Sequence, residues 1–344
     1  MSFKKIKSVG ILFLVLLSFE YAWSACTQVN WVFTQGTTVN LTGNTAPTIP
    51  IGVRRNNSNN NGNNHNCEFF IVINNGDPSN NTFTERDIEL NGTDTANEYP
   101  LQFYTNSART NIFKSIDQAT NNNDVLFGTT NDPNNNNNNT NITTVNYYVF
   151  LDPNLYVRDG AYSDIFEARL YRGTIANKSQ AVLDRTQNIT FTYQQPIKFD
   201  VSLVPTSAPF NISDTTETLD FGTIAAGELL GFDIVLKYND GYSLRMSSAN
   251  ASNNTGRLRR TGSGTGNCGD NCIPYTMRIN GSNTPITLST TLQEKAENTG
   301  NGSDISPAPN GLRIPATVTI GAIPTAALPG TYTDQVTISI VSNN

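Results

Sequence analysis

The pentapeptide Gly160-Ala161-Tyr162-Ser163-Asp164 and its near copy Gly330-Thr331-Tyr332-Thr333-Asp334 decide the fold of this chain. Each copy is followed by a run of β-branched and aromatic residues, at 165–171 and 335–341, of the kind typical of a core strand. The tyrosines of the two copies lie 170 positions apart, and a proline-containing stretch precedes both. A repeat on this scale predicts a duplicated domain.

The conformation of the repeated pentapeptide can be anticipated from sandwich folds. In a Greek-key β-sandwich, a tyrosine just ahead of a core strand often folds back, and its hydroxyl then reaches a backbone group of the preceding loop. We expect Tyr162 and Tyr332 to fix a corner in this way. Gly160 and Gly330 would allow the sharp turn before each tyrosine. The motif therefore predicts architecture.

The aspartate that closes each copy is expected to be structural as well. Asp164 and Asp334 can accept backbone hydrogen bonds in the turn, and the alternative, a catalytic carboxylate, lacks a recognisable partner in either strand. The single histidine, His65, lies in an asparagine tract, and no glycine-rich phosphate loop precedes a helix. We expect no enzymatic activity, no cofactor and no metal site.

Strand signals recur along the rest of the chain. Short apolar runs are found at 68–73, 147–151, 232–236 and 317–320. Asn-Gly and Asp-Gly pairs between such runs supply the positive φ that tight hairpins need. Because no segment keeps a helical period, we expect an all-β protein made of β-sandwiches.

The domain limits follow from the repeat. A weaker echo pairs the segments 100–103 and 274–277, each a candidate middle strand. The boundary then falls near Gln194-Gln195-Pro196, which gives an N-terminal domain at 25–194 and a C-terminal domain at 197–344. Two domains also suit the length of the chain.

The first 24 residues have the order of a secretory signal peptide. Lysines stand at positions 4, 5 and 7, an apolar run covers 9–19, and small residues occupy 22, 24 and 25. Lipidation of Cys26 is the alternative, but it requires a leucine-like residue three positions earlier, where Trp23 stands. Export implies an oxidising compartment, so four cysteines predict two disulfides. The economical pairing is Cys26 with Cys67 and Cys268 with Cys272.

Charge and composition exclude other partners. The formal net charge is −6, and removal of the leader, which holds three lysines and one glutamate, makes the chain still more acidic. An acidic chain repels phosphate backbones, so nucleic acid is not an expected partner. Asparagine tracts at 56–66 and 134–139 are too polar to bury a core and are expected to be loops; their amides could alternatively hydrogen-bond a glycan.

The C-terminal half resembles the spore coat protein U domain family, from which subunits of archaic chaperone–usher pili are made. The resemblance rests on these segments: Leu219-Asp220-Phe221-Gly222-Thr223, Tyr242-Ser243-Leu244-Arg245-Met246, Ile273-Pro274-Tyr275, and Pro329 to Ile340. It covers most of residues 197–344. The N-terminal half matches only at Cys67, at its middle strand and at 160–171, and it departs from the family by its asparagine-rich insertions.

The resemblance implies immunoglobulin-like domains whose last strand is donated by a neighbouring subunit. We expect the first domain to close itself with the strand 188–193, and the second, whose last strand runs to Ile340, to lack an equivalent. Val336, Ile338 and Ile340 would then line the edge that receives first a periplasmic chaperone and later the strand of the adjacent subunit. Because the mature chain begins almost at Cys26, it has no obvious strand to donate, so we expect it at the pilus tip.

A tip adhesin needs a binding surface on its outer domain. The candidates are two apolar loop segments, Val125-Leu126-Phe127 and Leu155-Tyr156-Val157, which could attach to a host or abiotic surface. The alternative is that they are short strands or core plugs. We expect a protein secreted through the periplasm and an outer-membrane usher to the cell surface, with roles in attachment and biofilm formation. The rival hypothesis is a structural pilus or spore-coat-type subunit without receptor binding.

Overall fold

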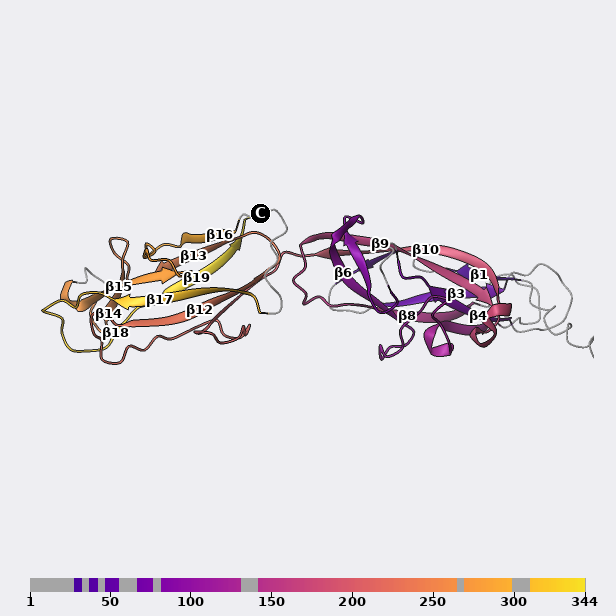
Figure 1. The fold of residues 1–344 in the computed structure, drawn as a ribbon, viewed down its shortest axis with the longest axis horizontal. Helices are drawn as coiled ribbons and strands as arrows, with labels where there is room; N and C mark the ends of the chain where they lie inside the picture. Colours follow the sequence, from indigo (N-terminus) through magenta and orange to yellow (C-terminus); the bar gives the residue numbers. More distant parts are fainter. Residues whose placement is uncertain are drawn as a thin grey trace, which may run out of the picture. The chain divides into compact units, whose positions relative to one another are not determined.

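The computed structural model describes residues 28–32, 37–42, 47–55, 67–76, 82–130, 142–264, 269–298 and 310–343. This part of the chain contains 19 β-strands, three short 3-10 helices and no α-helix (Figure 1). The prediction of an all-β fold is therefore confirmed. The chain divides into two compact units: unit 1 comprises Met1–Pro153 and Ala161–Gln194, and unit 2 comprises Asn154–Gly160 and Gln195–Asn344.

Unit 1 is built from strands β1 to β10. Their bounds are Val29–Val32, Thr38–Leu41, Thr48–Arg55, Cys67–Ile73, Arg86–Leu90, Asp94–Tyr104, Leu126–Thr130, Thr143–Leu151, Gly160–Arg172 and Val182–Gln195. They form one curled sheet in the order β1-β3-β8-β6-β5-β9-β10-β2, while β4 pairs with both β7 and β9. Two 3-10 helices accompany these strands, η1 at Asn122–Asp124 and η2 at Ile175–Gln180.

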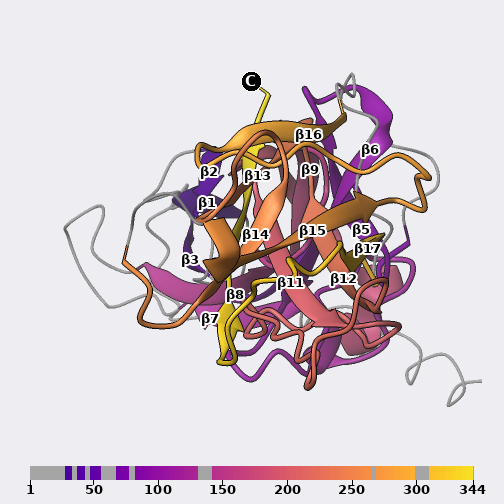
Figure 2. The ribbon, with the colours of Figure 1, turned by 90° about the vertical axis from the view of Figure 1, so that its left-hand side faces the viewer.

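Unit 2 is built from strands β11 to β19. Their bounds are Phe199–Pro205, Leu229–Tyr238, Tyr242–Ser248, Gly256–Arg260, Cys272–Ile279, Gln293–Asn298, Leu312–Ile320, Tyr332–Thr333 and Val336–Ser342, and η3 spans Gly269–Asn271. One sheet has the order β11-β12-β17-β15-β14-β18 and the other β16-β13-β19. Figure 2 shows the two layers of this unit, with β13 and β16 on one side and β12, β14 and β15 on the other. Side chains from both layers share one core cluster.

The two units repeat one topology. The order β3-β8-β6-β5 in unit 1 matches β12-β17-β15-β14 in unit 2, and β4 with its partners β7 and β9 matches β13 with β16 and β19. The repeated pentapeptides occupy equivalent places, because the first opens β9 and the second covers β18 and the step to β19. The start of β9 pairs with β5 and its end with β4, just as β18 pairs with β14 and β19 with β13.

The cores of the two units differ in composition. Unit 1 is filled by a chain of buried rings, with centroids 4.8 Å apart for Phe103 and Phe166, 4.9 Å for Phe103 and Phe191, and 4.9 Å for Tyr99 and Tyr193. Ring pairs at such distances stabilise a core beyond their buried area. The core of unit 2 is mostly aliphatic, with inward side chains from β12, β13, β15 and β17.

The part of the chain that the structure describes contains no helix long and apolar enough to cross a membrane.

Candidate functional site

A long groove opens along β19 in unit 2. Its volume is about 940 Å³. The groove floor is formed by core side chains of one sheet, among them Phe232, Met277 and Val318, and one wall is formed by Val336 and Ile338 of β19. The other wall is formed by Leu203 of β11 and the irregular segment 217–224. A groove with an apolar floor and a strand edge beside it has the form of a site for an extended polypeptide.

The apolar face of β19 is less buried than its counterpart in unit 1. At the repeat distance of 170, Val336, Ile338 and Ile340 correspond to three residues of β9, Phe166, Ala168 and Leu170. The β9 residues are at most 1 % exposed. The β19 residues pack against the core but stay partly exposed. The face that is sealed in unit 1 is therefore open in unit 2.

In unit 1 the corresponding space is filled by β10. Ile189, Phe191 and Tyr193 alternate along this strand and are all buried. β10 lies between β9 and β2, and it pairs in parallel with β2, with Phe191 opposite Val39 and Tyr193 opposite Leu41. In the described part of unit 2, β19 pairs only with β13, so no described strand takes the place of β10.

The second edge of the groove has a sequence counterpart in unit 1. The strand β2 is Thr-Val-Asn-Leu at 38–41, and 180 positions later the chain has Thr-Leu-Asp-Phe at 218–221. Leu219 and Phe221 are partly buried against the core and line the groove, yet this segment belongs to no strand. In the sequence, these residues are recognisable only as part of a family motif. Their likeness to β2 was the signal that could have assigned them to the groove.

The second copy of the repeated pentapeptide, at 330–334, lines part of the groove and forms a corner of the chain. The Tyr332 hydroxyl donates to the carbonyl oxygen of Leu328 at 2.6 Å, which is the geometry expected for this tyrosine. Gly330 has φ +153°, and a Cβ there would lie 2.7 Å from the Nε of Arg260. That nitrogen donates to the Pro329 carbonyl at 2.9 Å, so Arg260 holds the corner.

Asp334 joins three elements beneath this corner. Its carboxylate accepts hydrogen bonds from the Ser248 hydroxyl at 2.6 Å, the Asn250 backbone N–H at 3.0 Å and the Tyr275 hydroxyl at 2.6 Å. Burial, together with the negative charge of Asp334, raises the pKa of Tyr275. Asp334 was expected to bond within its own turn, but two of its donors are side chains from other elements and the third is a backbone group far away in the sequence. Its role is structural.

The first copy of the motif is built differently. Gly160 has φ +132°. Tyr162 is buried, with its ring 5.5 Å from that of Tyr99 in an edge-to-face contact. Asp164 accepts a hydrogen bond from the adjacent Ile165 N–H at 2.5 Å. The Tyr99 hydroxyl donates to the carbonyl of Asp152, in the segment between β8 and β9, at 2.6 Å.

The first candidate surface segment is mostly core. Val125 and Leu126 are 1 % and 4 % exposed, so burial contradicts their expected contact with a surface; Val125 belongs to a small core cluster and Leu126 to the short strand β7. Phe127, in β7, is 55 % exposed. The 3-10 turn η1 directly precedes this strand; Asn121 and Asp124 form its capping box, and Asp124 Oδ1 lies 2.9 Å from Lys114 Nζ. Burial acts to raise the pKa of Asp124, but hydrogen bonds from Lys114 and Thr120 outweigh it and lower that pKa.

The second candidate segment, Leu155-Tyr156-Val157, was expected in the N-terminal domain but is grouped with unit 2. The Tyr156 hydroxyl donates to the Asp200 carboxylate, and Lys198 Nζ lies 4.8 Å from the centre of its ring. All three residues are partly buried. Residues 154–160, which connect β8 with β9, belong to unit 2. Val125-Leu126-Phe127 and Leu155-Tyr156-Val157 therefore do not form one binding surface on unit 1.

Several sequence predictions fall on residues outside the described ranges. These are the signal peptide at 1–24, the asparagine tracts at 56–66 and 134–139, and the cysteines Cys26 and Cys268. Cys67 and Cys272 each belong to a disulfide. The described residues contain no group of three or more His, Cys, Asp or Glu side chains that could hold a metal ion.

Comparison with known proteins finds structural likeness only. No protein-family model matches the chain, and no curated protein matches it. The resemblance to the spore coat protein U domain family therefore stays a prediction from sequence motifs.

Several solved structures of pilus adhesins are similar to the chain. One is a chain of the CsuC–CsuE chaperone–tip adhesion subunit pre-assembly complex from archaic chaperone–usher Csu pili of Acinetobacter baumannii. The identity is 11 %, the match covers 90 % of this chain and 99 % of that chain, and the TM-score is 0.43. CfaE, the adhesive subunit of CFA/I fimbria of enterotoxigenic Escherichia coli, is 11 % identical, with coverages of 90 % and 92 % and a TM-score of 0.35.

A third similar structure is the CupB6 tip adhesin from Pseudomonas aeruginosa. It is 11 % identical, with coverages of 91 % and 92 % and a TM-score of 0.30. At these identities and TM-scores the likenesses carry no argument about function, which has to be derived from the groove and surfaces of the chain itself.

Proposed function

We propose that this chain is a tip adhesin of a chaperone–usher pilus, in which unit 2 accepts a β-strand from the adjacent subunit and unit 1 carries the binding surface. The observation that supports the proposal most strongly is the groove of about 940 Å³ beside β19, whose counterpart in unit 1 is filled by β10. The resemblance of the sequence motifs to the spore coat protein U domain family is the reason for proposing a chaperone–usher pilus as the assembly. A subunit with one sealed and one strand-accepting unit suits the end of a fibre.

The unit 1 arrangement suggests how the incoming strand would bind. By analogy with β10, the strand would run antiparallel to β19 and parallel to Thr218–Phe221, so main-chain hydrogen bonds would hold it on both sides. Apolar side chains at alternate positions would face Phe232, Met277 and Val318, as Ile189, Phe191 and Tyr193 face the core of unit 1. Val336, Ile338 and Ile340 would become buried. A periplasmic chaperone would cover the same edge before assembly.

The charge of the groove limits which side chains the incoming partner strand can carry. Among the described residues, its lining includes Glu217, Asp220 and Asp334 but no lysine or arginine. Acidic residues in the partner strand would therefore meet like charges in a partly desolvated site, which costs binding energy. We expect the partner strand to be neutral or basic beside its apolar positions.

The proposal can be tested by giving unit 2 its own closing strand. A copy of residues 173–195, which hold η2 and β10, is appended after Asn344. We expect the melting temperature of the chain to rise and backbone amides of β19 and 218–221 to gain protection in hydrogen–deuterium exchange, because apolar side chains and strand edges leave solvent.

The matched control carries serine at the copied positions of Ile189, Phe191 and Tyr193. It keeps the length and backbone of the appended segment but loses the buried side chains, so it should give no stabilisation. Equal protection of β19 amides in the parent chain, the appended chain and the control would contradict strand acceptance at this groove.

A further inference from the structure

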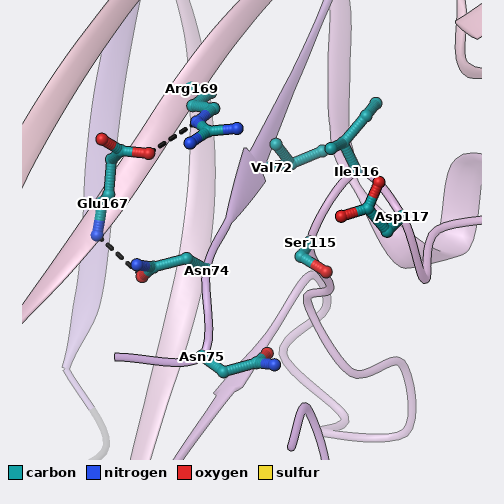
Figure 3. A pocket seen from close by; sticks show the side chains of 8 residues that line it. All are labelled: Val72, Asn74, Asn75, Ser115, Ile116, Asp117, Glu167 and Arg169. Atoms are coloured by element: carbon teal, nitrogen blue, oxygen red, sulfur yellow. Dashed lines mark hydrogen bonds and ion pairs between the residues drawn. The ribbon is translucent and has the colours of Figure 1, made fainter. Parts of the chain in front are cut away.

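A smaller hollow of about 220 Å³ lies in unit 1, between the end of β4, the loop 115–117 and β9. Six of the eight residues that line it are polar or charged. Figure 3 shows these side chains arranged around the hollow, with the carboxylate of Asp117 and the hydroxyl of Ser115 on one side and the Glu167–Arg169 pair on the other. Val72 and Ile116 supply an apolar patch.

The walls of this hollow are held in place before any ligand binds. Asn74 clamps β4 to β9, because its N–H donates to the Glu167 carbonyl at 3.0 Å and its side-chain oxygen accepts from the Glu167 N–H at 2.8 Å. The opposite loop is pinned by Lys178, whose Nζ donates to the carbonyls of Ile116 at 3.0 Å and Ala119 at 2.8 Å. A pre-formed site spends little binding energy on ordering.

One polar group at the hollow is unexplained by the fold. The side-chain oxygen of Asn75 is shielded from solvent and has no hydrogen-bond partner among the residues that the structure describes. Nearly all buried polar atoms in proteins are paired, so an unpaired acceptor calls for a ligand, a water or an ion. Asn75 lines the hollow, which makes a donor group within the hollow its natural partner.

The remaining chemistry of the hollow fits hydroxyl groups. Asn75 and Asp117 offer acceptors and Arg169 offers donors, while Glu167 Oε1 is already engaged by Arg169 Nε at 2.5 Å. A hydroxyl can donate and accept at once, so a ring with several hydroxyls satisfies both kinds of group. Two carboxylates against one guanidinium give the lining a negative balance, which disfavours anionic ligands.

The volume limits the size of the ligand. Pockets for drug-sized molecules have volumes of roughly 300–1,000 Å³. The hollow in unit 1 is below that range, so it suits one small ring and not a row of rings. We propose that this hollow binds a single neutral hexose ring, either free or at the end of a glycan. The biological role of this sugar binding rests on the proposed adhesive function of unit 1, whereas the binding itself rests on the residues of the hollow.

The test is sugar binding by the intact mature protein. Methyl mannoside, galactoside, glucoside and N-acetylglucosaminide are tested in solution by saturation-transfer NMR, and immobilised neutral, sialylated and sulfated oligosaccharides are tested on a glass array. We expect at least one neutral hexose to bind. The soluble glycosides test the free ring, and the array tests the glycan end.

Variants then locate the site. Asn75→Ala is expected to weaken binding about five- to tenfold, and Asp117→Asn about tenfold or more, because hydrogen bonds to charged groups are stronger. Asn283→Ala and Asp270→Asn, at exposed positions of unit 2, are the matched controls and should leave the affinity unchanged.

Three results would overturn the proposal: no neutral hexose bound in either format, a preference for sialylated or sulfated glycans, or full affinity in both pocket variants. The strand-insertion test concerns only unit 2. If the appended strand fails to stabilise unit 2 but sugar binds, the proposed pilus assembly is contradicted and the sugar site is supported. If the strand stabilises unit 2 but no sugar binds, the sugar site is contradicted and strand acceptance is supported.

Discussion

Units 1 and 2 share a strand order but differ at one position, and that position decides what each unit can do. In unit 1, β10 lies beside β9 in the sheet, and the β9 side chains Phe166, Ala168 and Leu170 are buried. In unit 2 the same face of β19 lines a groove together with residues that resemble β2. The two units therefore differ by one strand, because β10 of unit 1 has no counterpart among the described strands of unit 2.

The two edge strands of the small sheet in unit 2 differ in charge. Within the described residues, β16 and β19 flank β13. The sequence of β16 is Gln-Glu-Lys-Ala-Glu-Asn, whereas β19 is Val-Thr-Ile-Ser-Ile-Val-Ser and carries no charge. Charged side chains on an edge strand discourage pairing with other chains. Charge therefore protects the edge at β16, whereas the edge at β19 lacks this protection.

The comparison predicts the largest stability loss for the side chain that seals unit 1. Phe191 is fully buried, with its ring centroid 4.9 Å from Phe103 and 5.6 Å from Phe166. Phe191→Ala should lower the free energy of unfolding of unit 1 by about 3–5 kcal/mol, because it removes a large ring and leaves a cavity. Denaturant unfolding followed by the fluorescence of Trp31, in β1, measures this.

Phe127→Ala is the control for that substitution. It removes the same group in the same unit, but from a side chain that is 55 % exposed. We expect a loss within about 0.5 kcal/mol, as for most surface positions. Similar losses for the two variants would mean that β10 does not seal the core of unit 1.

A pair of aligned positions sharpens the comparison between the units. Leu170 and Ile340 lie 170 residues apart, on β9 and β19. Leu170→Ala should cost about 2–5 kcal/mol, as for a fully buried side chain. Ile340→Ala should cost less, about 1 kcal/mol, because its side chain is only partly removed from water. Hydrogen–deuterium exchange of the intact chain separates the effects on the two units.

The same pair can be measured after the strand copy has been appended. If the copy covers β19, the cost of Ile340→Ala should rise toward that of Leu170→Ala, while the cost of Leu170→Ala stays constant. A cost for Ile340→Ala that is as large as that for Leu170→Ala before any strand is added would show that the groove is already closed.

The sequence predicted the repeat well because the repeat is carried by local signals. A glycine with positive φ, a tyrosine and a strand with apolar residues at alternate positions recur at a fixed distance, and each has a conformational reason that is independent of the rest of the fold. The edge residues Val336, Ile338 and Ile340 were found in the same way, from the strand that follows the motif. Their partial exposure was not predictable from their types, because it depends on what lies beside β19.

The surface candidates show where such inference fails. Val125, Leu126 and Phe127 are three adjacent apolar residues, and their sequence does not tell which faces the core; the pairing of β7 with β4 decides that Leu126 is buried and Phe127 exposed. Tyr156 precedes the motif in sequence but contacts Asp200 of unit 2. Contacts over such separations follow from topology, which local patterns do not specify.

Two buried tyrosines provide the smallest contrast between the units. Tyr147 is buried in unit 1, and its hydroxyl has no hydrogen-bond partner among the described residues, whereas Tyr275 in unit 2 donates to Asp334. Burial raises the pKa of both hydroxyls, so both stay protonated in the folded chain at neutral pH.

Tyr275→Phe should lower the free energy of unfolding by about 1.5–3 kcal/mol, because Asp334 loses a donor. Tyr147→Phe should be neutral or stabilise by up to about 1 kcal/mol, because it removes an unpaired buried group. Differential scanning calorimetry of the two variants measures both changes, and a loss of stability in Tyr147→Phe equal to that in Tyr275→Phe would mean that the Tyr147 hydroxyl has a partner, such as a buried water.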